Sequence, residues 1–342
     1  MNQVTPEKVA ELDRLFRTKS PVCIVTHAHP DGDAMGSSIA LADFLRTHYG
    51  QPATILIPDA APAELAFLTG GETILDASLH DEASALPGQA GLILCTDFNR
   101  FNRTGVLEAA IAAASCPKVL IDHHLDPDPA PFDLVFSRND VSSASELVYD
   151  ILLAMPQTQG QAARLPRKCA AALMTGMTTD TNNFANSVYP GTLRMAAELL
   201  AAGVDRDSIV RHLYFEYREN RVRAISRLLQ DHLDISENGI ALIIVTRAFM
   251  DAMDLREGEL EGLVNIPLSI ASVRMSLLLR EEEDFFRVSI RSKEGCSANR
   301  LAVNKFHGGG HELAAGGRLY VPGDIPDKSG AAGYVRKVTA GL

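Results

Sequence analysis

The stretch PVCIVTHAHPDGDAMGS at residues 21–37 decides the fold of the first half of the chain. It begins with a continuous apolar run, 21–26, in which β-branched residues are frequent, as is typical of a buried strand. A polar loop with Pro, Gly and Asp follows, and then the helical pattern SSIALADFLRTHY, which ends at Gly50. The stretch therefore predicts a strand, a loop and a helix.

Similar apolar runs recur further along the chain, with helical or loop segments between them. They are ATILI at 53–57, GLILCT at 91–96 and KVLI at 118–121. Ser143, with Glu146 three residues later, predicts a capping box that opens the helix SASELVYDILLAM, and a further helix is expected over 167–177. This alternation predicts a doubly wound α/β fold, in which helices cover both faces of a mainly parallel sheet.

A second, smaller domain of mixed α/β type is expected after a helical connection. The pattern is almost wholly helical from about 190 to 234 and carries Arg218, Arg221, Arg223 and Arg227. Contact of these arginines with a nucleic-acid backbone is one alternative, but we favour a solvated face or an interdomain contact because glutamates are interspersed among them. GIALIIVT, SVRMSLLLR and FRVSIRS then read as strands and SANRLAVNKF as a helix. We therefore expect a first domain over 1–195, a helical linker over 196–235 and a second domain over 236–342.

Composition excludes several classes of protein. The chain has 342 residues, 46% of them hydrophobic and 22% charged, which is typical of a globular protein with material for two cores. Its net charge of −11 disfavours duplex DNA as a main partner. No apolar run approaches the roughly 20 residues that span a bilayer, and no CxxC pair occurs among the five cysteines. The stretch MNQVTPEKVAELDRLF is polar and has neither the apolar core nor the cleavage site expected of a signal peptide. We expect a cytoplasmic protein with reduced thiols and no membrane partner.

Acidic and histidine residues gather where the predicted parallel strands end, which is where open α/β sheets bind ligands. They are His27, Asp31 and Asp33 after the first strand, Asp97 after GLILCT, and Asp122, His123 and His124 after KVLI, and Asp180 follows a helix. Taken singly, each is as well explained by a capped turn or a satisfied polar group. Taken together they exceed what turn chemistry explains, and they predict a metal site.

The ligand types indicate which metal. A mixture of imidazole and carboxylate without thiolate favours Mn²⁺ or Mg²⁺ over structural Zn²⁺, and the imidazoles make manganese our first choice. Two such ions about 3.5–4 Å apart would polarise phosphoryl oxygens and supply hydroxide for in-line attack on phosphorus. The expected chemistry is phosphoester hydrolysis without a covalent intermediate.

These motifs carry a resemblance. HxHPDGDAxGS at 27–37, Asp97, Asp-His-His at 122–124 and TTDT at 178–181 occur in the order of the DHH phosphoesterase superfamily. GGGHELAAGG at 308–317, preceded by RVSIRS at 287–292, resembles the DHHA1 substrate domain of the branch of nano-RNases and 3′-phosphoadenosine 5′-phosphate phosphatases. Together the motifs cover nearly the whole chain. One departure is Asn182 and Asn183 after TTDT, where many relatives have a glycine.

The resemblance implies roles for the clustered residues. His27, Asp31 and Asp97 would hold one Mn²⁺, while Asp33, Asp97, His123 and Asp180 would hold the other, with Asp97 bridging. Asp122 would orient a ligating histidine. His124 would face the substrate as an electrostatic or proton-transfer partner.

The second domain carries candidate contacts to a phosphate. Gly308, Gly309 and Gly310 can bring backbone N–H groups close to an anion, His311 adds a donor, and Arg291 offers a bidentate fork. Taken alone, these residues are equally a flexible turn and a surface arginine. The resemblance adds Ser292, and it implies that short oligonucleotides bind in a cleft between the domains.

Several functions are compatible with these motifs. The leading hypothesis is a hydrolase that degrades very short RNA to mononucleotides and converts adenosine 3′,5′-bisphosphate to AMP. A phosphodiesterase of cyclic di-AMP or its linear product pApA is the first alternative, and an exopolyphosphatase or pyrophosphatase is a weaker one. A catalytically silent nucleotide sensor is a different class, and the intact ligand set opposes it. A homodimer is one assembly that the sequence allows.

Overall fold

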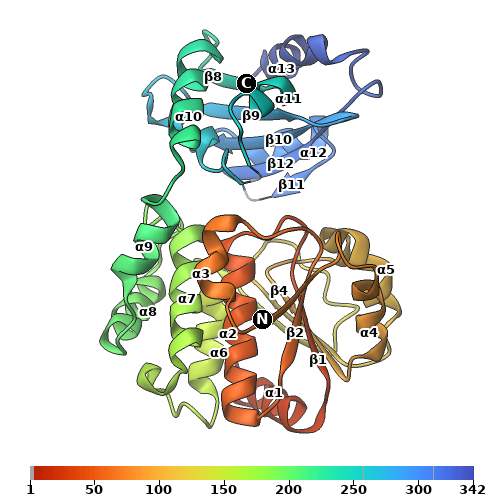
Figure 1. Cartoon of the computed structure of the whole chain (residues 1–342), viewed down its shortest axis with the longest axis vertical. Helices are drawn as coiled ribbons and strands as arrows, with labels where there is room; N and C mark the ends of the chain where they lie inside the picture. The colour runs from red at the N-terminus through yellow and green to blue at the C-terminus, as the bar shows by residue number, and fades with distance from the viewer. Residues whose placement is uncertain (1–3, 257, 311) are drawn as a thin grey trace. The chain divides into compact units, whose positions relative to one another are not determined.

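The chain forms two compact units, Met1–Glu216 and Tyr217–Leu342 (Figure 1). The computed structural model describes residues 4–256, 258–310 and 312–342. The first unit is a doubly wound α/β fold with a six-stranded parallel sheet, and the second contains a mixed six-stranded sheet. The predicted fold class is therefore confirmed.

Every strand pair in the first sheet is parallel, and the strand order is β3-β2-β1-β4-β5-β6. The strands are β1 (Val22–Val25), β2 (Ala53–Ile57), β3 (Thr73–Asp76), β4 (Leu92–Thr96), β5 (Lys118–Asp122) and β6 (Leu134–Ser137). The predicted strands are the central ones, which are apolar throughout because both faces are covered. The prediction missed β3 and β6, which are short, partly exposed strands at the two edges.

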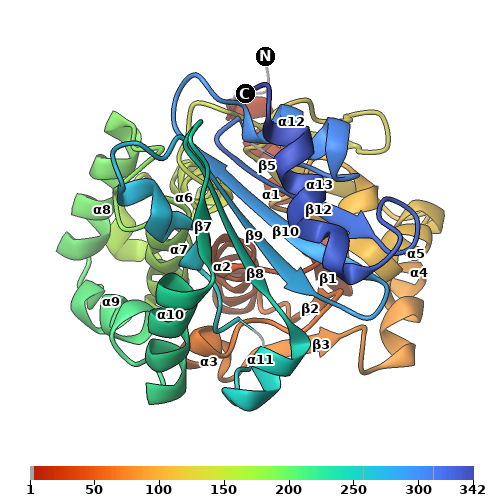
Figure 2. The ribbon, with the colours of Figure 1, turned by 90° about the horizontal axis from the view of Figure 1, so that it is seen from above.

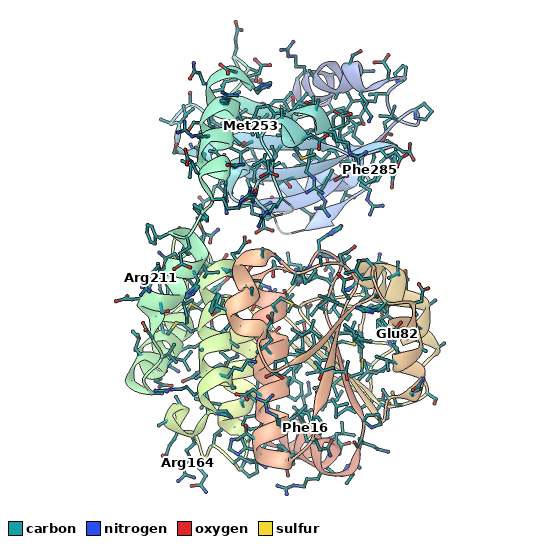
Figure 3. All side chains as sticks on the ribbon, viewed as in Figure 1. Phe16, Glu82, Arg164, Arg211, Met253 and Phe285 are labelled. Carbon is teal, nitrogen blue, oxygen red and sulfur yellow. The ribbon has the colours of Figure 1, made fainter. Side chains whose placement is uncertain are left out.

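Helices cover both faces of this sheet, as Figure 1 shows. The first-unit helices are α1 (Pro6–Thr18), α2 (Gly32–Tyr49), α3 (Ala66–Thr69), α4 (Leu86–Gln89), α5 (Glu108–Ala113), α6 (Ala144–Ala154), α7 (Arg167–Asp180), α8 (Pro190–Ala201) and α9 (Arg206–Tyr214). One face packs against α1, α2, α6 and α7, where Phe16, labelled in Figure 3, is fully buried. The other face packs against a smaller core that includes Ile111 of α5.

Helices α2 and α7 approach each other closely at two glycines. A Cβ atom on Gly36 would lie 2.6 Å from the carbonyl oxygen of Ala172 and 2.9 Å from the amide nitrogen of Gly176. A Cβ on Gly176 would lie 2.0 Å from the Ser145 hydroxyl of α6. Real Cβ atoms cannot approach backbone this closely, so glycine at these positions sets the spacing of α2, α6 and α7.

The predicted helix ends are observed. Gly50 ends α2 in the left-handed region at φ +65°, and the Ser143 hydroxyl accepts a hydrogen bond from the Glu146 amide at the start of α6. The Glu146 carboxylate accepts hydrogen bonds from the amide and hydroxyl of Ser142 and from the Thr192 hydroxyl. In a standard capping box the Glu146 carboxylate would accept from the amide of the N-cap residue, Ser143, whereas here it accepts from the amide of Ser142, one residue earlier.

The second unit is a mixed sheet covered on both faces (Figure 2). Its strand order is β11-β12-β10-β9-β8-β7, in which only the pair of β8 and β9 is parallel among the described residues. Its elements are α10 (Glu219–Asp231), β7 (Leu233–Ile235), β8 (Ile240–Val245), α11 (Arg247–Ala252), β9 (Met275–Glu281), β10 (Phe285–Ser292), α12 (Ala298–Lys305), β11 (Gly309–Gly310), β12 (Ala314–Tyr320) and α13 (Ala331–Thr339). The strands predicted from GIALIIVT, SVRMSLLLR and FRVSIRS are β8, β9 and β10, and the predicted helix is α12.

Side chains alternate between the two faces of these strands, as the period of two requires. Leu277 and Leu279 of β9 pack toward α12 and α13, whereas Leu278 between them packs toward α10. Phe285, labelled in Figure 3, opens β10 directly after the acidic turn at 282–284, which connects β9 to β10.

The helical stretch expected from 190 to 234 is observed, and the division between the units falls inside it. Helices α8 and α9 belong to the first unit, and α10 belongs to the second. Arg218 pairs with Asp254 and Glu259, and Arg221 stacks 3.7 Å from the Tyr217 ring centroid. These arginines therefore hold α10 within the second unit.

No helix in the described residues is long and apolar enough to cross a membrane.

We expect Gly36→Ala to destabilise the first unit by about 1–3 kcal/mol, because the added methyl group must displace the backbone of α7. Gly88→Ala in α4 is the matched control, since a Cβ there meets nothing within 4 Å. The urea midpoint of each variant measures the effect. Equal midpoints for the two variants would show that the contact between α2 and α7 can relax.

Candidate metal centre

The predicted ligands converge because their strands are neighbours. The strand order reverses between β1 and β4, and β5 lies next to β4. His27 follows β1, Asp97 follows β4, and Asp122 ends β5 with His123 directly after it. Parallel strands end at the same edge of a sheet, and the point of reversal leaves room between the loops that follow. The candidate site lies at that edge.

Asp97 lies between two imidazoles. Its Oδ2 atom is 3.3 Å from Nε2 of His27, and its Oδ1 atom is 3.4 Å from Nε2 of His123. The residue is 2% exposed and adopts a left-handed conformation at φ +64°, with its amide donating to the carbonyl of Ile121. Non-glycine residues in this region cost free energy and occur at functional sites, where the surrounding structure holds them.

The ligand atoms fall into groups that share members. His27, Asp31 and Asp97 form one group, Asp33, His123 and Asp180 form a second, and Asp97, His123 and His124 form a third. Within each group the candidate ligand atoms all lie within 4.8 Å of one another. Asp97 belongs to the first and third groups and therefore connects the two histidine environments.

Hydrogen bonds fix which histidine nitrogen faces the cluster. Nδ1 of His27 donates to the carbonyl oxygen of Ala28 at 2.9 Å, which leaves Nε2 on the side of Asp97. Nδ1 of His124 donates to Oδ1 of Asp122 at 2.7 Å, so that nitrogen is already used. The expectation was that Asp122 orients a ligating histidine. The structure shows Asp122 orienting His124, the residue expected to face the substrate.

Asp33 is held by the beginning of α6. Its Oδ2 atom accepts from the amide of Ala144 at 2.6 Å, and its Oδ1 atom accepts from the amide of Ser145 at 2.8 Å. These amides did not figure in the sequence prediction, although the capping motif at Ser143 marks the helix start that supplies them. Each carboxylate oxygen has a second lone pair, so Asp33 can still accept a cation.

Asp31 has a comparable structural role at the start of α2. Its Oδ1 atom accepts from the amides of Asp33 and Ala34 at 2.9 and 3.1 Å, and it lies 4.0 Å from Nε2 of His27. The positive ends of α2 and α6 therefore both point at the acidic cluster and partly offset its charge.

The cluster carries more negative charge than its surroundings neutralise. Burial and the charges of Asp97 and Asp180 raise the pKa of Asp33 well above its usual value. Burial likewise raises the pKa of Asp180 to about 7. Burial would lower the pKa of His27, but the hydrogen bond to Asp97 and the charges of Asp97 and Asp31 outweigh it and raise that pKa to about 9.

These observations fit a divalent cation. The Oδ1 atom of Asp97 is buried and accepts no hydrogen bond within the part of the chain that the structure describes. A buried carboxylate oxygen without a donor is costly, and a cation would compensate it. The oxygen and imidazole donors are those that Mn²⁺ accepts.

Sequence comparison agrees with this geometry. Residues 21–177 match the DHH family, N-terminal domain, and residues 241–329 match the DHHA1 domain. The bifunctional oligoribonuclease and PAP phosphatase NrnA of Thermus thermophilus is 30% identical over 315 residues, which cover 91% of this chain and 87% of that protein. The chain belongs to the DHH phosphoesterase family.

Other relatives extend the likeness over the whole chain. NrnA of Bacillus subtilis is 28% identical over 314 residues, covering 91% of this chain and 93% of the relative. The structure of an exopolyphosphatase-related protein from Bacteroides fragilis superposes with a TM-score of 0.88 at 32% identity, covering 98% of this chain and 96% of that one. As a DHH protein, the chain is a hydrolase that acts on phosphoester bonds, and the enzymes of this family depend on metal ions.

The candidate substrate residues lie at one end of the sheet in the DHHA1 unit. Arg291 of β10 pairs with Ala314 of β12, and Gly310 of β11 pairs with Ala315 beside it. Ser292 is 7% exposed, and its hydroxyl donates to the carbonyl of Cys296 at 2.7 Å. His311 lies outside the described residues.

The glycines of this motif have structural reasons of their own. A Cβ on Gly308 would lie 1.9 Å from the carbonyl oxygen of Gly316, and Gly310 has a φ of +145°, which favours glycine. By contrast, a Cβ on Gly309 would have the Asn299 side chain as its nearest neighbour, at 3.8 Å. The close pairing of β11 and β12 therefore requires Gly308 and Gly310 but leaves room at Gly309.

We expect metal binding to release protons at pH 7. With its pKa at about 9, metal-free His27 carries a proton on Nε2 at that pH, and this proton must leave before the nitrogen can bind a cation. Metal affinity should therefore rise between pH 7 and pH 9. Calorimetric titration with Mn²⁺ in buffers of different ionisation enthalpy measures the protons released, and His27→Gln should release fewer. Heats that do not depend on the buffer would contradict the assignment of His27.

Proposed function

We propose that the chain hydrolyses short oligoribonucleotides to mononucleotides and adenosine 3′,5′-bisphosphate to AMP, using two divalent ions, Mn²⁺ by preference. The relatives named for these activities align along 91% of the chain, through both the metal cluster and the DHHA1 unit. The net charge of −11 favours a small anion held at a cationic centre over duplex DNA.

The observation that carries the proposal is the position of Asp97 between two groups of ligands. We assign His27, Asp31 and Asp97 to one ion. We assign Asp33, Asp97, His123 and Asp180 to the other, with Asp97 shared. The contacts of Asp97 with Nε2 of both His27 and His123, at 3.3 and 3.4 Å, support this division. The bond from Nδ1 of His124 to Asp122 supports leaving His124 out of the ligand set.

Two cations held by these residues would supply a polarised phosphoryl group and a water molecule of lowered pKa for in-line attack on phosphorus. The residues around them position the reaction. The two amides that hold Asp33 keep its carboxylate at a fixed angle, and the Ala28 carbonyl does the same for the ring of His27. We assign His124 to the substrate side, where Asp122 orients its ring for proton transfer to the leaving oxygen.

The DHHA1 unit would bind the part of the substrate away from the cleaved bond. We assign Arg291 and the backbone N–H groups of Gly308, Gly309 and Gly310 to a substrate phosphate, with Ser292 and His311 as further contacts. The shared sheet end of Arg291 and Gly310 supports this assignment. The Ser292 hydroxyl also stabilises the turn before α12, so replacing it would affect both the turn and the substrate.

The purified protein with Mn²⁺ should cleave the dinucleotide pApA and adenosine 3′,5′-bisphosphate faster than longer RNA, cyclic di-AMP or pyrophosphate. EDTA should abolish turnover, and Asp97→Asn should lower it by at least about 100-fold, because one carboxylate serves both ions. Asp76→Asn is the control, since this carboxylate also ends a parallel strand but bonds to Ser78 at the sheet edge. Chromatography of the products follows all substrates together.

Other product patterns would replace the proposal. Preferential opening of cyclic di-AMP would assign the chain to cyclic dinucleotide turnover. Preferential cleavage of pyrophosphate would make it a pyrophosphatase, whose substrate contains no nucleoside. Nucleotide binding without hydrolysis of any substrate would make the chain a sensor, and Asp97→Asn would then leave its regulatory effect intact.

We expect Gly309→Ala to raise KM for pApA several-fold, because its methyl group would narrow the space that we assign to the phosphate. The free energy of unfolding should stay within about 0.5 kcal/mol of the parent value, since a Cβ there makes only ordinary contacts with the Asn299 and Val303 side chains, at 3.8 and 4.0 Å. Gly308→Ala should instead destabilise the unit, since its methyl group would overlap the Gly316 carbonyl. An unchanged KM in Gly309→Ala would remove Gly309 from the substrate site.

A further inference from the structure

Arg103 lies beside the metal cluster in a segment with a fixed backbone. It belongs to the short 3₁₀ segment Phe101–Leu107, which follows β4 and Asp97. Its carbonyl accepts from the amide of Ala28 at 2.6 Å, and its own amide donates to the carbonyl of Arg100 at 3.1 Å. The backbone of Arg103 is thus tied to the residue next to His27.

Gly105 brings this segment close to the loop after β1. It adopts φ +54°, and a Cβ there would lie 3.5 Å from Cβ of Ala28 and 3.7 Å from Cβ of Pro58. The loop therefore packs against the ends of β1 and β2. The Cα position of Arg103 is therefore fixed relative to the loop that carries His27.

Arg103 is half-buried, and its guanidinium has no partner in the part of the chain that the structure describes. Among residues 4–256, 258–310 and 312–342 it donates no hydrogen bond and forms no ion pair or ring contact.

The absence of pairing is informative because carboxylates are near. Asp31 lies three residues after Ala28, and Asp97 lies six residues before Arg103. An arginine with a structural role between these loops would be expected to form a bidentate pair with one of the two carboxylates. Asp97 instead contacts His27 and His123, and Asp31 caps α2. Five N–H donors thus remain at the edge of a site whose substrate is an anion.

We propose that Arg103 binds a phosphoryl oxygen of the substrate beside the metal cluster, as a substrate-positioning residue of the first unit. The inference rests on the proposed phosphoesterase function and adds a contact that the ligand set does not contain. A guanidinium fork can take two oxygens of one phosphate, which fixes the orientation of the phosphate as well as its position. The same contact would hold the phosphate of a product nucleotide.

The test compares Arg103→Ala and Arg103→Lys with Arg100→Ala. Arg100 lies three residues earlier in the same loop, is exposed and donates to the carbonyl of Asp126, so it is a matched control. We expect Arg103→Ala to lower kcat/KM for pApA roughly 10- to 100-fold, as is typical when a hydrogen bond to a charged group is lost. Arg103→Lys should keep part of the activity, since it retains the charge and loses the fork.

Binding of AMP to the metal-loaded protein, measured by calorimetry, gives a readout that needs no turnover. It should weaken in Arg103→Ala by a similar factor and stay unchanged in Arg100→Ala, while Mn²⁺ affinity stays the same in all variants. Unchanged AMP binding in Arg103→Ala, or a loss of Mn²⁺ affinity that accounts for the whole effect, would overturn the inference. A parent chain that binds AMP through Arg103 but cleaves no substrate would refute the proposed function alone.

Discussion

A buried carboxylate must find hydrogen-bond donors, and the way in which Asp33 finds them determines how three helices meet. Its oxygens accept from the amides of Ala144 and Ser145 at the beginning of α6. These bonds hold the first turn of α6 against the first turn of α2, and α7 can pass alongside only because Gly176 carries no side chain. Because a buried carboxylate without donors is unfavourable, Asp33 constrains how α2 and α6 pack together. The position of Asp180, at the end of α7, follows from the same contact.

Much of this fold could be predicted from local sequence. The central strands are buried on both faces, so each is a continuous apolar run that differs clearly from its neighbours. Strands β3 and β6 escaped prediction because edge strands bury less surface and leave a weaker pattern. The helix ends at Gly50 and Ser143 were predictable because capping is decided within a few residues.

The candidate ligands could be predicted because they follow apolar strands, but the hydrogen-bond partners of their side chains could not. His27, Asp97 and His123 follow strands whose order in the sheet brings them together, and the residue types are visible in the sequence. The bond between Asp122 and His124 depends on side-chain orientations that spacing does not specify. The sequence did not single out Arg103 because arginines are common in polar loops. Its proposed role depends on two structural observations, the hydrogen bond from the Ala28 amide to its carbonyl and the absence of a side-chain partner in the described residues.

The charge balance of the site explains why the carboxylates are clustered while Arg103 lies at the edge of the cluster and pairs with none of them in the described residues. Asp33, Asp97 and Asp180 are too close to remain ionised together without compensation, as the raised pKa of Asp33 and Asp180 indicates. Two divalent cations would relieve that repulsion, because their positive charges balance those of Asp31, Asp33, Asp97 and Asp180 and leave the site able to accept an anion. An arginine that paired with Asp31 or Asp97 would compete with those cations for the same oxygens. Holding Arg103 by its backbone at the edge of the cluster avoids this competition and leaves its donors for an anion that approaches from outside.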